Sequence, residues 1–170
     1  PATATGDACG IVVVGRKGRQ AFVLADRTVQ GRSPRSWGGA VSAAAREFGA
    51  HEVVAEIART PVEHQVGMMW RTNMAEMEGM IFLFDEPGRR AFWMRNTLLP
   101  LDIAYIAPDG TLLEVHAAQP RDESPIPSDS ERVQFVLETR QGWFQRNQVK
   151  PGMQIRTEKG SLLETFILRR

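Results

Sequence analysis

Every second position is apolar in two parts of the chain, which is the pattern of a strand with one buried face. Residues 53–57 show this alternation first. Residues 132–138 repeat it, so we expect Val133, Phe135 and Leu137 to point into the core. The apolar run over 80–84 predicts a fully buried strand. Further strands are predicted over 11–14, 21–24, 91–94, 101–107, 111–117 and 153–156.

Helix signals are short. Thr60, Pro61 and Glu63 form a capping-box pattern, so a helix of one or two turns should begin at Pro61. Gly67 is placed to end that helix in a left-handed conformation. Two more short helices are predicted over 40–48 and 142–148, and the tail over 162–168 is expected to add a strand or to pack as an arm.

The turn Pro108-Asp109-Gly110 predicts a hairpin with a three-residue loop. Such a loop pairs Ala107 with Thr111. Counting back along both strands then places Asp102 opposite His116 on one face of the sheet.

These elements predict an α+β fold of mainly antiparallel strands, a compact bent-sheet or small barrel-like domain with two short helices. Residues 1–50 carry a net charge of +4 and are rich in glycine, whereas the remainder carries −3. We therefore expect a basic N-terminal extension over 1–50, a domain over 51–158 and a tail over 159–170. The basic residues of the extension could contact phosphates, but without an aromatic or motif context a solvated, partly disordered segment is favoured.

Composition excludes several classes of protein. Hydrophobic residues make up 42% and charged residues 24%, which is typical of a globular chain. The longest apolar run is far too short for a membrane span, and a single cysteine excludes an internal disulfide framework. The three histidines show no metal-ligand spacing, and the net charge of +1 gives no general reason to bind nucleic acid. We expect no cofactor.

The segment 92–103, FWMRNTLLPLDI, resembles the signature of the prokaryotic family known as domain of unknown function 192 (DUF192). Three further blocks resemble the family pattern in the same order, at 67–71 (GMMWR), at 78–82 (EGMIF) and at 137–152 (LE, then G, then KPG). The resemblance covers about residues 51–157 and implies a compact β-rich fold. Many members carry export signals, so a periplasmic or exported location is expected, although this chain shows no signal peptide. The resemblance implies no reaction.

Polar residues inside the matching blocks are the candidates for a ligand site. An arginine can hold a carboxylate or phosphate with two hydrogen bonds, and amide or carboxylate groups can hold hydroxyls. The alternative is structural, since such side chains often hold turns, and Arg71 could simply pair with Glu78 or Glu138. The candidate ligand-binding residues are Arg71, Trp93, Asn96, Thr97, Asp102 and Glu138.

Two other chemistries are open but less favoured. Asp102 and His116 could form the base pair of a small hydrolase-like enzyme, although His116 lies outside the matching blocks. The spacing of Met74, Met77 and Met80 could hold Cu(I) through thioethers, but methionine also fills gaps in cores.

Trp93 lies between Phe92 and Met94 on a predicted strand, so its indole should face away from both. That ring would need cover from a ligand, a partner or the tail over 162–168. Together these features predict a small-ligand-binding or accessory domain of the cell envelope that acts on an unknown polar ligand or protein partner, and an enzyme is the less favoured alternative.

Overall fold

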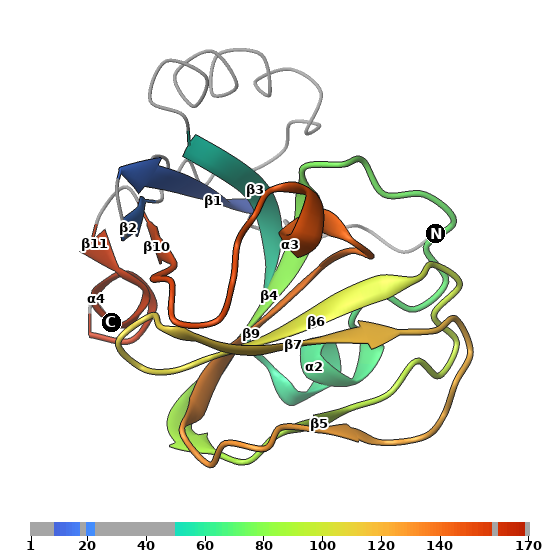
Figure 1. The fold of residues 1–170 in the computed structure, drawn as a ribbon. Helices are drawn as coiled ribbons and strands as arrows, with labels where there is room; N and C mark the ends of the chain where they lie inside the picture. Colours follow the sequence, from blue (N-terminus) through green and yellow to red (C-terminus); the bar gives the residue numbers. More distant parts are fainter. Residues whose placement is uncertain (1–8, 18–19, 23–49, 158–159, 169–170) are drawn as a thin grey trace.

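The computed structural model describes residues 9–17, 20–22, 50–157 and 160–168. The helix predicted over 40–48 lies outside these residues. The protein is α+β, with a mostly antiparallel sheet and three short helices in its described part (Figure 1).

One seven-stranded sheet forms the framework. Its strands lie in the order β2-β1-β3-β4-β9-β6-β7, and the two end strands do not pair, so the sheet is open rather than a barrel. All neighbours are antiparallel except β3 and β4, which are parallel. The strands are β1 (Cys9–Lys17), β2 (Gln20–Phe22), β3 (Ala50–Ala58), β4 (Glu78–Gly88), β6 (Leu101–Ile106), β7 (Leu112–Ala118) and β9 (Val133–Arg140).

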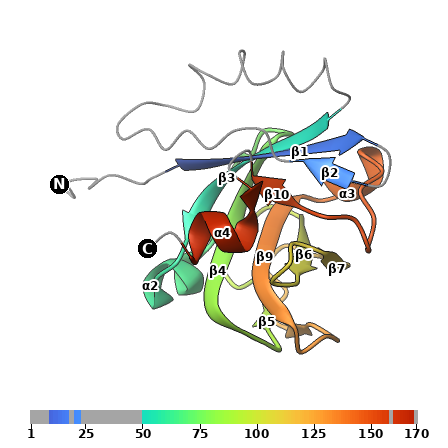
Figure 2. The ribbon, with the colours of Figure 1, turned by 90° about the vertical axis from the view of Figure 1, so that its left-hand side faces the viewer.

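The sheet is strongly bent. In Figure 2 the strands β1 and β3 run across the top of the molecule, whereas β4 and β9 run downward. The hairpin predicted from 11–14 and 21–24 exists as β1 and β2, and β1 pairs with β3 from Cys9 to Gly15. The division of the chain at residue 50 stays a prediction, but these strands join the main sheet.

Two separate cores cover the two faces of the sheet. One contains Leu137, Trp143 and Phe166, and the other contains Met80, Ile103 and Tyr105. The central strand β9 is therefore buried on both faces, from Val133 through Thr139. Val133, Phe135 and Leu137 are buried as predicted, but the residues between them are buried too, because a strand that is covered from both sides buries both of its faces.

The parallel pair β3–β4 requires a long crossover. This crossover contains the helix α2 (Pro61–Val66) and the loop over 67–77. The predicted capping box is confirmed, with the Thr60 hydroxyl accepting from the Glu63 amide and the Glu63 carboxylate accepting from the Thr60 amide. Gly67 ends the helix at a positive φ of 46°, but its ψ of −127° differs from the expected left-handed helical conformation.

Smaller elements complete the fold. Two short ribbons pair β5 (Ala91–Phe92) with β8 (Ile126–Pro127) and β10 (Arg156–Thr157) with β11 (Gly160–Ser161). The predicted helix over 142–148 is α3 (Trp143–Arg146). The tail, expected as a strand or arm, instead forms a third helix, α4 (Leu162–Phe166), with its own capping box.

The β6–β7 hairpin differs from its predicted register. The three-residue loop is present, and the Ala107 amide donates to the Thr111 carbonyl at 2.9 Å. However, Tyr105 pairs with Glu114 while Ile106 pairs with Leu112, so Leu113 is an extra residue that forms a bulge. Because one extra residue moves later side chains to the other face, Asp102 lies opposite Ala117.

His116 instead lies opposite Ile103, so Asp102 and His116 are on opposite faces of the sheet. The predicted Asp102–His116 catalytic pair was therefore wrong. Among the described helices, none has the length and apolar character needed to cross a membrane.

Candidate functional site

The signature blocks meet at one backbone contact. The Trp70 amide donates to the Asn96 carbonyl at 2.9 Å, and the Asn96 side-chain amide lies 3.9 Å from the Met69 sulfur. Trp70 and Asn96 both have a positive φ, at 64° and 55°. A left-handed tryptophan is rare and costs free energy, so the surrounding structure must hold it there. The result is an indole that is 66% exposed.

A row of side chains crosses one face of the sheet beside this contact. The strand register places Glu56, Met80, Glu138, Ile103 and His116 directly next to one another on successive strands. Neighbouring strands lie about 4.8 Å apart, so each residue of the row contacts the next. Met80 therefore lies between two carboxyl groups of the row, that of Glu56 on one side and that of Glu138 on the other.

Arg71 forms a two-pronged ion pair with Glu56 at the start of this row. Its Nη1 donates to Oε1, and its Nη2 donates to Oε2 at 2.6 Å. Both side chains are about one-third exposed. Glu56 was not among the partners considered from the sequence. The guanidinium of Arg71 is therefore already paired with the Glu56 carboxylate.

Glu138 is the buried acid of this row, with only 4% of its surface exposed, and it lines neither of the hollows described below. Burial raises the pKa of its carboxyl to about 8, against the opposing effect of the Arg71 charge. Its Oε2 has no hydrogen-bond partner in the described part of the chain. Glu138 is therefore mostly neutral at pH 7.

A pocket of about 340 Å³ opens above the first strands of the row. Its walls come from β3, from the start of β4 and from the crossover loop, and include Glu56, Trp70, Arg71, Asn73 and Glu78. A second hollow of about 240 Å³ lies beside it. Both are lined by Thr72, Asn73 and Met74, and the second also by Leu99, Pro100 and Arg140.

Asp102 lies outside these pockets and has a structural contact. Its Oδ2 accepts a hydrogen bond from the Gly142 amide at 2.8 Å. Burial raises the pKa of the Asp102 carboxyl, while the amides of Gly142, Phe144 and Trp143 oppose that rise. This side chain therefore holds the turn that leads into α3.

Thr97 and Trp93 are likewise not brought into the pocket. The buried Thr97 hydroxyl donates to the Arg95 carbonyl at 3.3 Å. Trp93 is 42% exposed, and the Arg95 guanidinium lies 5.4 Å from its ring centroid. The buried side chains of the tail, Leu162 and Phe166, do not cover the Trp93 ring. They pack in the core that contains Trp143.

His116 belongs to a different contact. Its Nε2 lies 2.7 Å from Glu114 Oε2, and its ring packs against Tyr105. Glu114 also accepts from the amides of Asp129 and Ser130 at 3.0 and 3.2 Å. This network anchors the loop after β8 to β7.

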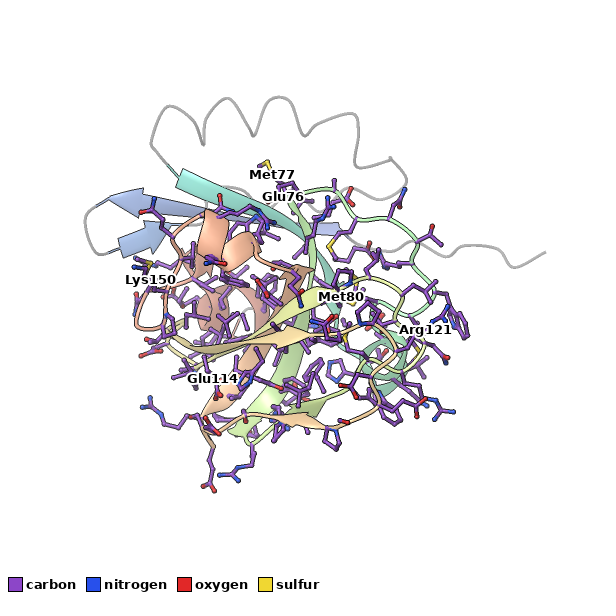
Figure 3. The ribbon with its side chains drawn as sticks, turned by 45° about the vertical axis from the view of Figure 1, so that its right-hand side comes forward. Glu76, Met77, Met80, Glu114, Arg121 and Lys150 are labelled. Atoms are coloured by element: carbon purple, nitrogen blue, oxygen red, sulfur yellow. The ribbon has the colours of Figure 1, made fainter. Side chains whose placement is uncertain are left out.

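The methionines do not gather in one exposed loop. Met74 and Met80 are buried in the core together with Met68 and Met94, whereas Met77 belongs to neither core cluster. Figure 3 labels Met77 beside Glu76 and well apart from Met80. The copper site stays a prediction, and this burial supports the packing alternative. No group of three potential His, Cys, Asp or Glu ligands occurs among the described residues.

The sequence missed several residues of the pocket. Glu56 was not named, whereas Trp70 lies inside a signature block next to Arg71 and is among the aromatic residues that the sequence offers as lining of a pocket. Arg140 had a usable signal, because it follows Glu138 by two positions on a strand and so points to the same face. Thr72 and Asn73 carried no pattern that would distinguish them from ordinary loop residues.

Solved structures with the same fold come from two bacteria. A protein of unknown function from Novosphingobium aromaticivorans DSM 12444 is 41% identical, with a TM-score of 0.59, over 61% of this chain and 74% of that chain. A candidate transcription regulator from Sinorhizobium meliloti 1021 is 30% identical, with a TM-score of 0.65, over 88% of this chain and 94% of that chain. No curated protein matches the chain.

The family model described as Uncharacterized ACR, DUF192, matches residues 43–157. This match covers more than half of the chain and includes every signature block that meets around Trp70 and Arg71. The chain belongs to the DUF192 family.

Proposed function

We propose that the protein binds a small hydroxylated ligand of the saccharide class in the 340 Å³ pocket. The observation that carries this proposal is Trp70, which is held left-handed and exposed at the wall of a pocket that is also lined by polar residues, among them Glu56, Arg71 and Asn73. A sugar ring has an apolar C–H face that packs on an indole and a hydroxyl edge that needs donors and acceptors. The volume is near the lower end for ligand pockets, which favours a small ligand.

The charges of the pocket argue against a bare anion as its occupant. Glu56 and Glu78 line it together with Arg71, and the fork of Arg71 is taken by Glu56. An anion placed here would have to displace Glu56 and leave that carboxylate without its partner. Hydroxyl groups can instead donate to the carboxylates and accept from the guanidinium without breaking the ion pair.

Calorimetric titration of the full chain with neutral sugars tests this function. Trp70→Ala should weaken binding by about tenfold or more, since an aromatic contact is worth ~1 kcal/mol beyond the area it buries. Trp93→Ala is the matched control, because Trp93 is also exposed but does not line the pocket. Failure of every neutral sugar to bind, or equal losses in both variants, would contradict the proposal.

Placement of this domain in the cell envelope is a second part of the proposal and rests on the family resemblance. An exported domain would meet saccharides as components of the envelope. Cell fractionation with an antibody against the native protein tests the location, and detection in the cytosolic fraction alone would refute it.

A further inference from the structure

We infer that the ligand is an acidic saccharide whose anionic group binds Arg140, at the far end of a cleft that begins at Trp70. The inference rests on the proposed function and deepens it by naming the chemical class of the ligand. It combines the shared wall of the two hollows, the state of the polar residues on that wall, and the position of Arg140 on the sheet.

The two hollows are neighbours along one loop. Thr72, Asn73 and Met74 line both of them. Met74 is buried, whereas Thr72 and Asn73 are exposed. A ligand that occupies both hollows must therefore pass over a hydroxyl and an amide.

Those two polar side chains are available to a ligand. Neither Thr72 nor Asn73 makes a side-chain hydrogen bond within the part of the chain that the structure describes. A hydroxyl and a carboxamide together offer donors and acceptors in both directions, which suits the hydroxyl groups of a sugar. The shared wall therefore continues the polar lining of the first pocket.

Arg140 differs from the arginines that have acidic partners. Arg71 is paired with Glu56 and Arg146 with Glu76. Across residues 9–17, 20–22, 50–157 and 160–168, no ion pair or side-chain hydrogen bond of Arg140 is found, and yet this exposed residue lines the second hollow. Its guanidinium can donate two hydrogen bonds to a carboxylate or phosphate of a ligand, and no ion pair within the protein has to break first.

The carboxylate of Glu78 is held by a backbone contact in the crossover loop. Glu78 lies on the neighbouring strand β4, and its Oε2 accepts from the Ala75 amide at 2.8 Å. Glu78 is thus held by the loop rather than by Arg140, with which it forms no ion pair.

The sheet register gives the approximate distance between the two ends of the cleft. Glu56 and Glu138 lie in one row, two strand spacings apart, and Arg140 lies two residues beyond Glu138 on the same face. With strands about 4.8 Å apart and about 3.4 Å per residue, the backbone positions of Glu56 and Arg140 are roughly 12 Å apart. That span fits an acidic disaccharide better than a single ring.

Two pairs of probes test the inference, and each pair differs only in the anionic group. Lactobionate is compared with lactitol, and trehalose 6-phosphate with trehalose, so that carboxylate and phosphate are tested separately. Calorimetry on the full chain should show that at least one acid binds about tenfold more tightly than its neutral counterpart, the gain expected for one charge-assisted contact at an exposed arginine. That ratio should fall as salt is raised from 50 to 500 mM.

Arg140→Gln should bring the acid-to-neutral ratio of affinities to about one. Arg132→Gln is the matched control, since Arg132 is an exposed arginine just before the opposite end of β9 and its loss changes the net charge equally. The control should keep the wild-type ratio.

The outcomes separate this inference from the proposed function. Neutral sugars that bind through Trp70 without any preference for the acids, or a preference that survives Arg140→Gln, would overturn the inference and leave the function standing. Inorganic phosphate that binds as tightly as trehalose 6-phosphate would overturn the acidic saccharide as the ligand. No binding of any of the four sugars would overturn both.

Discussion

Two buried acids of the signature, Asp102 and Glu138, differ in the hydrogen bonds that their carboxyl groups accept. Asp102 accepts from the Gly142 amide and is influenced by two further amides of the same turn. Glu138 has one oxygen without a partner among the described residues and only the Arg71 charge to favour its ionised form. Asp102 therefore stabilises a turn, whereas the burial of Glu138 lowers the free energy of unfolding when its carboxyl is ionised.

The burial of Glu138 predicts a specific pH dependence of stability. Burial raises its pKa from an ordinary value of 4.5 to about 8 in the folded chain. Between these values the folded state binds the extra proton, so the free energy of unfolding falls as pH rises from about 4.5 to about 8. Urea denaturation of Glu138→Gln should show a flatter dependence and greater stability than wild type at pH 9.

The sign of this effect makes it easy to contradict. At pH 4.5 wild type and Glu138→Gln should be nearly equal, because both side chains are then neutral. Curves that stay parallel from pH 5 to pH 9 would show that Glu138 titrates as an ordinary acid.

Removal of the Asp102 carboxyl should destabilise the fold without changing ligand affinity. Asp102→Ala leaves the Gly142 amide without its acceptor, which costs about 1–3 kcal/mol. Asp102→Asn keeps an acceptor oxygen and should lose less. Urea denaturation measures the stabilities, and a loss of sugar binding in folded Asp102→Asn would contradict the structural role.

Elements were predictable where the signal is local. The helix α2 follows from Thr60, Pro61 and Glu63, whose capping contacts lie within four consecutive positions, about one turn of chain. The hairpin loop after Ala107 was equally local. The bulge at Leu113 was not, because nothing in the alternation of 111–117 marks an extra residue.

The same limit applies to the candidate site. Arg71 and Asn96 could be named because they stand in signature blocks, but the Glu56–Arg71 ion pair depends on the parallel pairing of β3 with β4. Pairings between strands that are distant in sequence leave no local pattern. The tail helix α4 was missed for a different reason, because Ser161 and Glu164 carry the same local capping pattern as α2 and that pattern was overlooked.

The helix α4 should contribute to the stability of the whole domain. Phe166 is 7% exposed and packs in the same core as Trp143, so Phe166→Ala should cost about 3–5 kcal/mol. Leu168→Ala is the control at the end of the same segment, since Leu168 is 67% exposed. Thermal denaturation compares the two variants, and equal melting temperatures would show that a domain ending at residue 158 is complete without the tail.

At the scale of the whole molecule, the candidate cleft lies where the crossover loop meets the sheet. The loop over 67–77 connects two parallel strands, and its contacts include the Met68 and Met74 side chains in the core and the Trp70 amide on Asn96. The Arg71–Glu56 ion pair ties the same loop to β3. A ligand in the cleft would therefore contact both the crossover and the sheet and would hold them together.

Ligand binding should accordingly stabilise the entire fold and protect the crossover most. A sugar supplied at 100 times its dissociation constant should raise the free energy of unfolding by about 2.7 kcal/mol, a shift of roughly 5 °C or more in melting temperature for a chain of this size. Hydrogen exchange should slow at the amides of 68–77 more than at those of α4, because α4 packs in the other core. Trp70→Ala at the same sugar concentration should show neither effect. Uniform protection across both cores would mean that the ligand only shifts global unfolding, whereas protection centred on α4 would place the binding site on the opposite face of the sheet.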